Sequence, residues 1–155
     1  MINSLFMADA HFYASGLKFS CKRCSSCCRY DSGYVYLSEN DLEKLIKKLK
    51  MDRSKFINTY CRWVSGFDGN KVLSLREKSN KDCVLWDSCC LVYNARPLQC
   101  STFPFWSSIV SSKKAWEIAS SGCPGMNSGI LHSEKTIGEH IKMRSSQPII
   151  SKQGV

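Results

Sequence analysis

Apolar residues follow a helical period in the segment after residue 38, and charged residues occupy the positions between them. Ser38 and Asp41 at the start of this segment are typical of a capping box. The pattern predicts an amphipathic helix that begins after Ser38 and buries a single stripe. The positions i, i+3, i+4 and i+7 of that stripe are Leu42, Leu45, Ile46 and Leu49.

A second helix is predicted after Asp52, which can cap it, and before the turn signal of residues 66–69. Residues 33–37 and 71–78 have the composition of short strands. Ser133 can cap a last helix that runs to about residue 144. The apolar face of the second helix would hold Phe56, Tyr60, Trp63 and Val64.

These elements predict a small α+β domain with short strands and two to three helices. Residues 82–106 contain four cysteines and are expected to form loops and short extended pieces. We expect the domain to cover residues 1–145 and a flexible tail to cover residues 146–155. The chain shows no internal repeat, linker or second domain.

Composition suggests that the hydrophobic core is small and that the fold needs further stabilisation from whatever the cysteines bind. Of the 155 residues 43% are hydrophobic, but this count includes ten cysteines, so the remaining apolar inventory is thin. No stretch approaches the length of a membrane span, and the start of the chain lacks the features of a signal peptide. We therefore expect a cytoplasmic protein with no membrane partner. In a reducing compartment, a cysteine-rich pattern indicates metal binding rather than disulfide bonds.

The net charge does not by itself indicate a nucleic-acid partner. The chain carries 22 Lys and Arg against 13 Asp and Glu, a balance of +9, and the basic residues are scattered. If eight cysteines were thiolates around two metal centres of net charge about −2 each, the total would fall to about +5. Part of the basic excess would then be internal counter-charge.

Four cysteines within eight residues carry most of the chemical information. Cys21, Cys24 and Cys27 repeat a two-residue gap, which lets a tight loop turn successive sulfurs toward a metal at about 2.3 Å. The same spacing holds three irons of a 4Fe–4S cluster in bacterial ferredoxins. Cys123, which precedes Pro124, is the candidate for a fourth ligand.

Adjacent cysteines seldom bind one metal, because neighbouring side chains of an extended backbone point to opposite sides. Cys27 and Cys28 are therefore expected to face different surroundings. Either one binds a metal and the other packs as a small hydrophobic residue, or they belong to two neighbouring sites. The thiols available for such a site are Cys83, Cys90 and Cys100.

Five ordered elements of the sequence resemble the YkgJ-type cysteine cluster family, which is also described as a zinc- or iron-chelating CxxCxxCC domain. The resemblance runs from about residue 16 to residue 125, and the conjunction of elements is specific, whereas any single element would not be. The elements are the CxxCxxCC of residues 21–28 with Gly16-Leu17-Lys18-Phe19 before it and Arg29 after it, Cys83-Val84-Leu85, Cys90-Leu91-Val92-Tyr93, Arg96-Pro97 with Cys100-Ser101-Thr102-Phe103-Pro104-Phe105, and Cys123-Pro124-Gly125.

The resemblance implies a set of metal ligands. It leaves out Cys61, which we expect to be buried as a small apolar residue, and Cys89. The chain departs from the family at Ser101, where an arginine is usual, so one cation beside the expected thiolates is missing. Carried over by position, the ligands are Cys21, Cys24, Cys27, Cys28, Cys83, Cys90, Cys100 and Cys123.

Arg96 is the one further candidate for cofactor binding. It could donate hydrogen bonds to backbone carbonyls or compensate thiolate charge, and the competing interpretation is a surface arginine that braces a loop. The three histidines do not fit a Cys–His zinc spacing.

The leading hypothesis is a cysteine-ligated metal protein of redox or accessory role, in which a metal centre supports the α+β domain. The spacing favours an iron–sulfur cluster of the 4Fe–4S type, with Zn²⁺ as the alternative cofactor. A second hypothesis is a cluster-dependent enzyme or accessory subunit related to flagellin lysine N-methylases. We find no glycine-rich nucleotide motif or catalytic constellation, and independent catalysis is not expected. A zinc-ribbon-like nucleic-acid binder is the least favoured hypothesis, because no recognition helix is evident.

Overall fold

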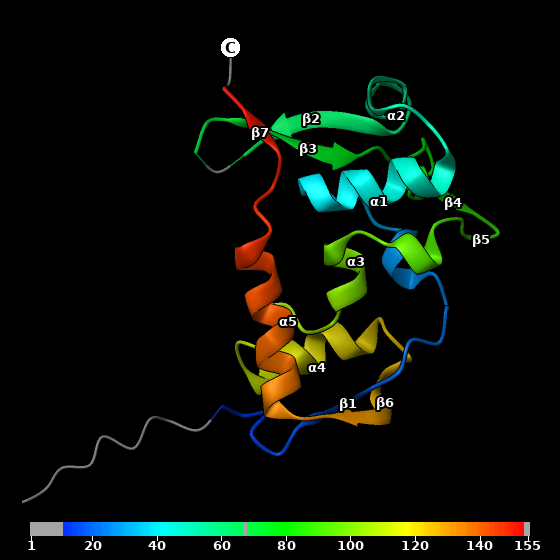
Figure 1. Ribbon diagram of the computed structural model, residues 1–155. Helices are drawn as coiled ribbons and strands as arrows, with labels where there is room; N and C mark the ends of the chain where they lie inside the picture. The colour runs from blue at the N-terminus through cyan, green and yellow to red at the C-terminus, as the bar shows by residue number, and fades with distance from the viewer. Residues whose placement is uncertain (1–10, 67, 154–155) are drawn as a thin grey trace, which may run out of the picture.

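The chain forms five α-helices and seven short strands within the residues that the computed structural model describes, 11–66 and 68–153 (Figure 1). The strands make three small antiparallel sheets, which confirms the α+β class with more helices than the two to three expected. The first ten residues of the expected domain, residue 67 of the predicted turn and the last two residues of the expected tail lie outside the described residues. None of the described helices is long and apolar enough to cross a membrane.

One end of the molecule, which we call the first half although it includes the C-terminal strand, contains two capped helices and a three-stranded sheet. The Ser38 side chain accepts a hydrogen bond from the backbone N–H of Asp41, and the Asp41 carboxylate accepts one from the backbone N–H of Ser38, as predicted for a capping box. Asp52 caps the second helix by accepting a hydrogen bond from the backbone N–H of Lys55. The elements are α1 (Glu39–Leu49), α2 (Arg53–Tyr60), β2 (Cys61–Ser65), β3 (Lys71–Leu75) and β7 (Ser151–Lys152).

The predicted second helix is shorter than expected. It ends at Tyr60, and Trp63 and Val64 lie in β2, where they pair with Leu73 and Val72 of β3. The prediction was wrong because tertiary pairing decides this segment, whose aromatic and β-branched residues also fit a pleated strand. Residues 33–37 run along the other edge of β3 through isolated hydrogen bonds rather than as a continuous strand.

The other end of the molecule, which we call the second half, combines β1 from the start of the chain with later elements. The sequence pattern predicted these elements only in part. The Ser133 side chain caps the last helix as expected, by accepting a hydrogen bond from the backbone N–H of Thr136. A further helix after Ser112 was missed, and only Trp116 of its nine residues is buried. The elements are β1 (Leu17–Phe19), α4 (Lys113–Ser121), β6 (Met126–His132) and α5 (Glu134–Ser146).

Each half has its own apolar cluster. Figure 1 shows α1, α2, β2 and β3 at one end of the molecule and α4, β1 and β6 at the other, with the short helix α3 (Leu98–Thr102) between them. The first cluster consists of Leu37, Leu42, Leu45, Phe56, Cys61, Leu73, Leu75, Leu85 and Val92. The second cluster consists of Tyr13, Phe105, Val110, Trp116, Met126 and Ile137.

The C-terminal segment connects the two halves. α5 buries Ile137 in the second cluster, and the chain then reaches the first half, where Ile149 bridges to Ser38 and β7 pairs with β3. Residues 149–152, part of the expected flexible tail, are therefore paired with the sheet. The division of the chain at residue 145 stays a prediction.

Candidate metal centre

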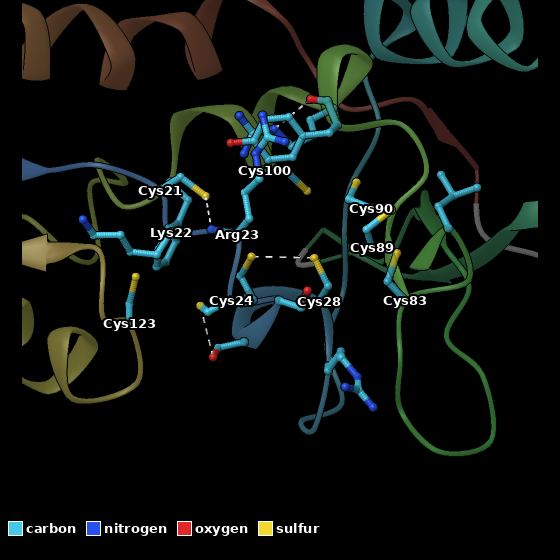
Figure 2. Close-up of a pocket in the computed structure, with 18 of the residues that line it drawn as sticks. Cys21, Lys22, Arg23, Cys24, Cys28, Cys83, Cys89, Cys90, Cys100 and Cys123 are labelled. Carbon is cyan, nitrogen blue, oxygen red and sulfur yellow. Dashed lines mark hydrogen bonds between the residues drawn. The ribbon is translucent and has the colours of Figure 1, made fainter. Parts of the chain in front are cut away.

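Nine of the ten cysteines line one cavity of about 560 Å³ (Figure 2). The cavity lies between the two apolar clusters. Leu75, Leu85 and Val92 of the first cluster form part of its wall, and Phe19 and Phe103, which pack against the second cluster, form another part. All ten cysteines are free thiols. The nine in the cavity wall are Cys21, Cys24, Cys27, Cys28, Cys83, Cys89, Cys90, Cys100 and Cys123.

The tenth cysteine and the histidines lie elsewhere. Cys61 is 2% exposed within the first cluster, in agreement with its expected packing role, and burial raises its pKa to about 12. His132 and His140 lie against the ring of Phe105 in the second cluster, and His11 contacts Glu134. None of the three lines the cavity.

The first cysteine loop owes its shape to left-handed backbone and a 3₁₀ turn. Arg23 and Ser25 have positive φ angles, and residues Ser26–Cys28 then form the turn η1. The backbone N–H of Arg23 donates a hydrogen bond to the sulfur of Cys21 at 3.4 Å, and the Cys24 thiol donates one to the Ser26 hydroxyl at 3.4 Å. A hydrogen bond donated to sulfur, such as that from the Arg23 N–H, tunes thiolate metal centres. The bond from Cys24 exists only while its thiol is protonated.

Cys27 and Cys28 do not face opposite directions as expected. Their Sγ atoms lie 3.7 Å apart in a thiol–thiol hydrogen bond. The expectation assumed an extended backbone, whereas the two residues belong to the 3₁₀ turn, in which successive side chains diverge less. The adjacent thiols can therefore serve one site.

The remaining cavity thiols come from three separate segments. The backbone N–H of Cys83 donates a 2.7 Å hydrogen bond to the carbonyl oxygen of Cys28. Cys89 and Cys90 form β5, which pairs with β4 (Trp86–Asp87). Cys100 lies in α3, and Cys123 follows the end of α4.

The protonation of these thiols is governed by burial and by one another. The hydrogen bond from Cys28 lowers the pKa of Cys27 to about 6, and the charge of Arg96 acts in the same direction. Burial raises the pKa of Cys83, Cys90 and Cys100, and the charges of neighbouring thiols add to the effect. Several thiolates can therefore coexist here only when a cation compensates their charge.

Arginines surround the thiols. The Nε of Arg96 donates a 3.0 Å hydrogen bond to the carbonyl oxygen of Tyr93, so Arg96 braces its loop in the cavity wall. Its guanidinium carbon lies 4.0 Å from the centroid of the Tyr93 ring, and that of Arg23 lies 4.2 Å from the same centroid. Two cations are thus held by one aromatic ring beside the thiols.

The cavity, its thiols and its arginines are contributed by one contiguous part of the sequence. The profile of a protein family described as "CxxCxxCC: Putative zinc- or iron-chelating domain" matches residues 20–124. The chain belongs to the CxxCxxCC family. The matched segment encloses all nine cavity cysteines, whereas α5 and β7 lie outside it.

Other similarities are more limited. Over 96 residues the chain is 30% identical to an uncharacterized protein of Methanocaldococcus jannaschii. The aligned segment makes up 60% of this chain and 48% of that protein, so the chain spans about half the length of that relative. No solved structure matches the chain.

The donor set fits the metals named for the CxxCxxCC family. Thiolates are soft ligands that bind zinc and iron–sulfur clusters, and the cavity offers more of them than the four that one zinc ion takes. Among the described residues, no three Cys, His, Asp or Glu side chains are already grouped as a metal site. The thiols line the cavity wall, so metal loading has to draw them inward.

Sequence reasoning named eight of the nine cysteines that line this cavity. The eight expected ligands all line it, although their role as ligands stays a prediction. Cys89 also lines it, which neither spacing nor family resemblance indicated. The available signal was its position directly beside Cys90, with which it forms the two-residue strand β5.

Proposed function

We propose that this protein binds an iron–sulfur cluster, with the 4Fe–4S type favoured over Zn²⁺, on the thiols of the cavity. Such a cluster would supply one-electron redox chemistry. Arg96 and Arg23 would offset the negative charge of the thiolates, and Phe19 and Phe103 would limit access of water. The ligands are drawn from Cys21, Cys24, Cys27, Cys28, Cys83, Cys90, Cys100 and Cys123.

The observation that supports this proposal is the combination of nine free thiols with a cavity of about 560 Å³. Structural zinc is held in a closed tetrahedral site by four ligands. A single Zn²⁺ ion takes up less space than a water molecule, whose share of liquid volume is about 30 Å³. Cavities of roughly 300–1,000 Å³ are typical of cofactor sites. Both thiol number and volume therefore favour a polynuclear occupant.

Purification without oxygen tests the proposal. We expect a brown protein with a broad absorbance band at about 400 nm that contains iron and acid-labile sulfide. The Cys61→Ser variant should retain the colour, because Cys61 lies outside the cavity. A colourless protein that contains stoichiometric zinc would contradict the iron–sulfur assignment.

A further inference from the structure

The two ends of the first cysteine loop are attached to different halves of the molecule. Before Cys21, the backbone N–H of Ser20 donates a 3.1 Å hydrogen bond to the carbonyl oxygen of Gly125 in the second half. At the other end, the carbonyl oxygen of Cys28 accepts the 2.7 Å hydrogen bond from Cys83 in the first half. The loop therefore crosses the cavity from one half to the other.

The attachment beside Cys21 is close enough to require glycine. A Cβ atom on Gly125 would lie 2.5 Å from the carbonyl oxygen of Ser20, a distance that backbone atoms do not tolerate. Cys123, two residues before Gly125, is consequently held near Cys21. Figure 2 shows Cys21, Cys24 and Cys123 on one side of the view, and Cys28, Cys83, Cys89 and Cys90 on the other.

These positions define two groups of thiols. The outer group of three consists of Cys21 and Cys24, which are exposed, and Cys123, which is half-buried. Cys27 is exposed, but it belongs with the inner thiols because its sulfur lies 3.7 Å from that of Cys28. The inner group consists of Cys27, Cys28, Cys83, Cys90 and Cys100; the exposed Cys89 on the same side in Figure 2 is left out because it stands outside the ligand set that the family resemblance implies.

We infer that the centre has two occupants, one on the outer group of three thiols and one on the inner group of five, and that the outer occupant carries an exchangeable external ligand. This inference rests on the proposed function. The inner group has enough thiols to complete a four-coordinate site. Three thiols leave one position open, as protein metal sites do where a water or substrate binds.

Charge near the outer group indicates the class of that external ligand. Lys22 and Arg23 lie between Cys21 and Cys24 and line the cavity. Neither forms an ion pair within residues 11–66 and 68–153. Unpaired cations beside an open metal position favour an anionic ligand, and a soft metal favours sulfur, so the expected class is a small thiolate.

Release of metal to a chromogenic chelator tests the two groups in the full-length wild-type protein, purified without oxygen. Bathophenanthroline reports iron and 4-(2-pyridylazo)resorcinol reports zinc. We expect two kinetic phases, a fast one from the outer group and a slow one from the inner group. A single phase would overturn the inference without any variant.

Matched serine variants assign the phases. Cys24→Ser should abolish the fast phase and leave the slow amplitude unchanged, Cys83→Ser should do the reverse, and Cys61→Ser should change neither. Loss of all metal in Cys24→Ser, or loss of none, would overturn the inference. Addition of 2-mercaptoethanol should change the absorption spectrum of the wild type but not of Cys24→Ser, and an unchanged wild-type spectrum would overturn the external thiolate.

The outcomes separate this inference from the function on which it rests. A colourless protein that releases zinc in two phases would contradict the iron–sulfur cluster and leave the two groups standing. A brown protein that releases iron in one phase would support the cluster and overturn the two groups. A protein without metal would contradict both.

Discussion

Arg29 forms an ion pair with Asp82, 53 residues away, with 3.0 Å between Nε and Oδ1. The carboxylate is almost fully buried, and the Arg29 guanidinium carbon also lies 3.9 Å from the centroid of the Trp86 ring. Arg29 follows Cys28 and Asp82 precedes Cys83, so the ion pair stands beside the hydrogen bond between those two cysteines. The pair fixes where the first cysteine loop meets the downstream cysteines.

Arg29→Lys should weaken this attachment although it keeps the charge. Lysine lacks the planar guanidinium that pairs with Asp82 and stacks on Trp86 at the same time. We expect a loss of about 1–3 kcal/mol in the free energy of unfolding, measured with urea. Arg53→Lys is the matched control, because its pair with Glu39 is exposed and should change stability by about 0–1 kcal/mol. Equal effects of the two substitutions would contradict the role given to Arg29.

Gly125→Ala should disturb the turn that follows Cys123. The added Cβ would push against the carbonyl oxygen of Ser20, and overpacking of this kind costs about 1–3 kcal/mol. Gly138→Ala is the control: a Cβ at Gly138 in α5 meets nothing within 4 Å, and alanine should stabilise the helix by about 0.5–1 kcal/mol. Thermal unfolding of the metal-loaded variants measures both effects. A Gly125→Ala protein as stable as the wild type would contradict the close approach.

Metal loading should release protons. Burial raises the pKa of Cys83, Cys90 and Cys100, so these thiols are protonated at neutral pH and lose their protons when a metal binds them. Metal affinity should therefore increase with pH from neutrality to beyond about pH 8.5, the ordinary pKa of a cysteine thiol. Calorimetric titrations in buffers of different ionisation enthalpy count the protons. An affinity independent of pH would contradict thiol ligation.

Stability of the metal-loaded protein should fall at alkaline pH because of Cys61. Its pKa is raised to about 12 in the folded state, against about 8.5 in an unfolded chain. Above about pH 8.5 the unfolded state loses this proton and the folded state keeps it, so the free energy of unfolding decreases by at most about 1.4 kcal/mol per pH unit until about pH 12. Cys61→Ala should flatten this slope in urea titrations. An unchanged slope would show that Cys61 does not titrate on unfolding.

Local signals in the sequence predicted the elements that depend on local chemistry. The caps at Ser38, Asp52 and Ser133 begin helices where expected, because a cap needs only a side chain and the backbone three residues ahead. For the segment of β2 the sequence predicts the end of a helix, because the pairing of β2 with β3 is a tertiary contact that periodicity does not report.

The sequence predicted which cysteines come together at the candidate site better than it predicted how they are arranged. Spacing and resemblance selected eight thiols that line one cavity. The 3.7 Å approach of Cys27 and Cys28 could not be foreseen, because it depends on the 3₁₀ turn that the positive φ of Ser25 introduces. The division of the thiols between the two halves depends on the hydrogen bonds of Ser20 and Cys83, which only the folded chain brings together.

The path of the C-terminal segment affects what metal loss does to the molecule. α5 places Ile137 in one apolar cluster, and Ile149 and β7 are paired with the sheet of the other, so the chain passes between the two halves here as well as through the first cysteine loop and through α3 (Figure 1). The two halves therefore stay covalently linked at these three places when the metal is lost. These links limit how far the halves can separate, which keeps their thiols at a high local concentration for reloading.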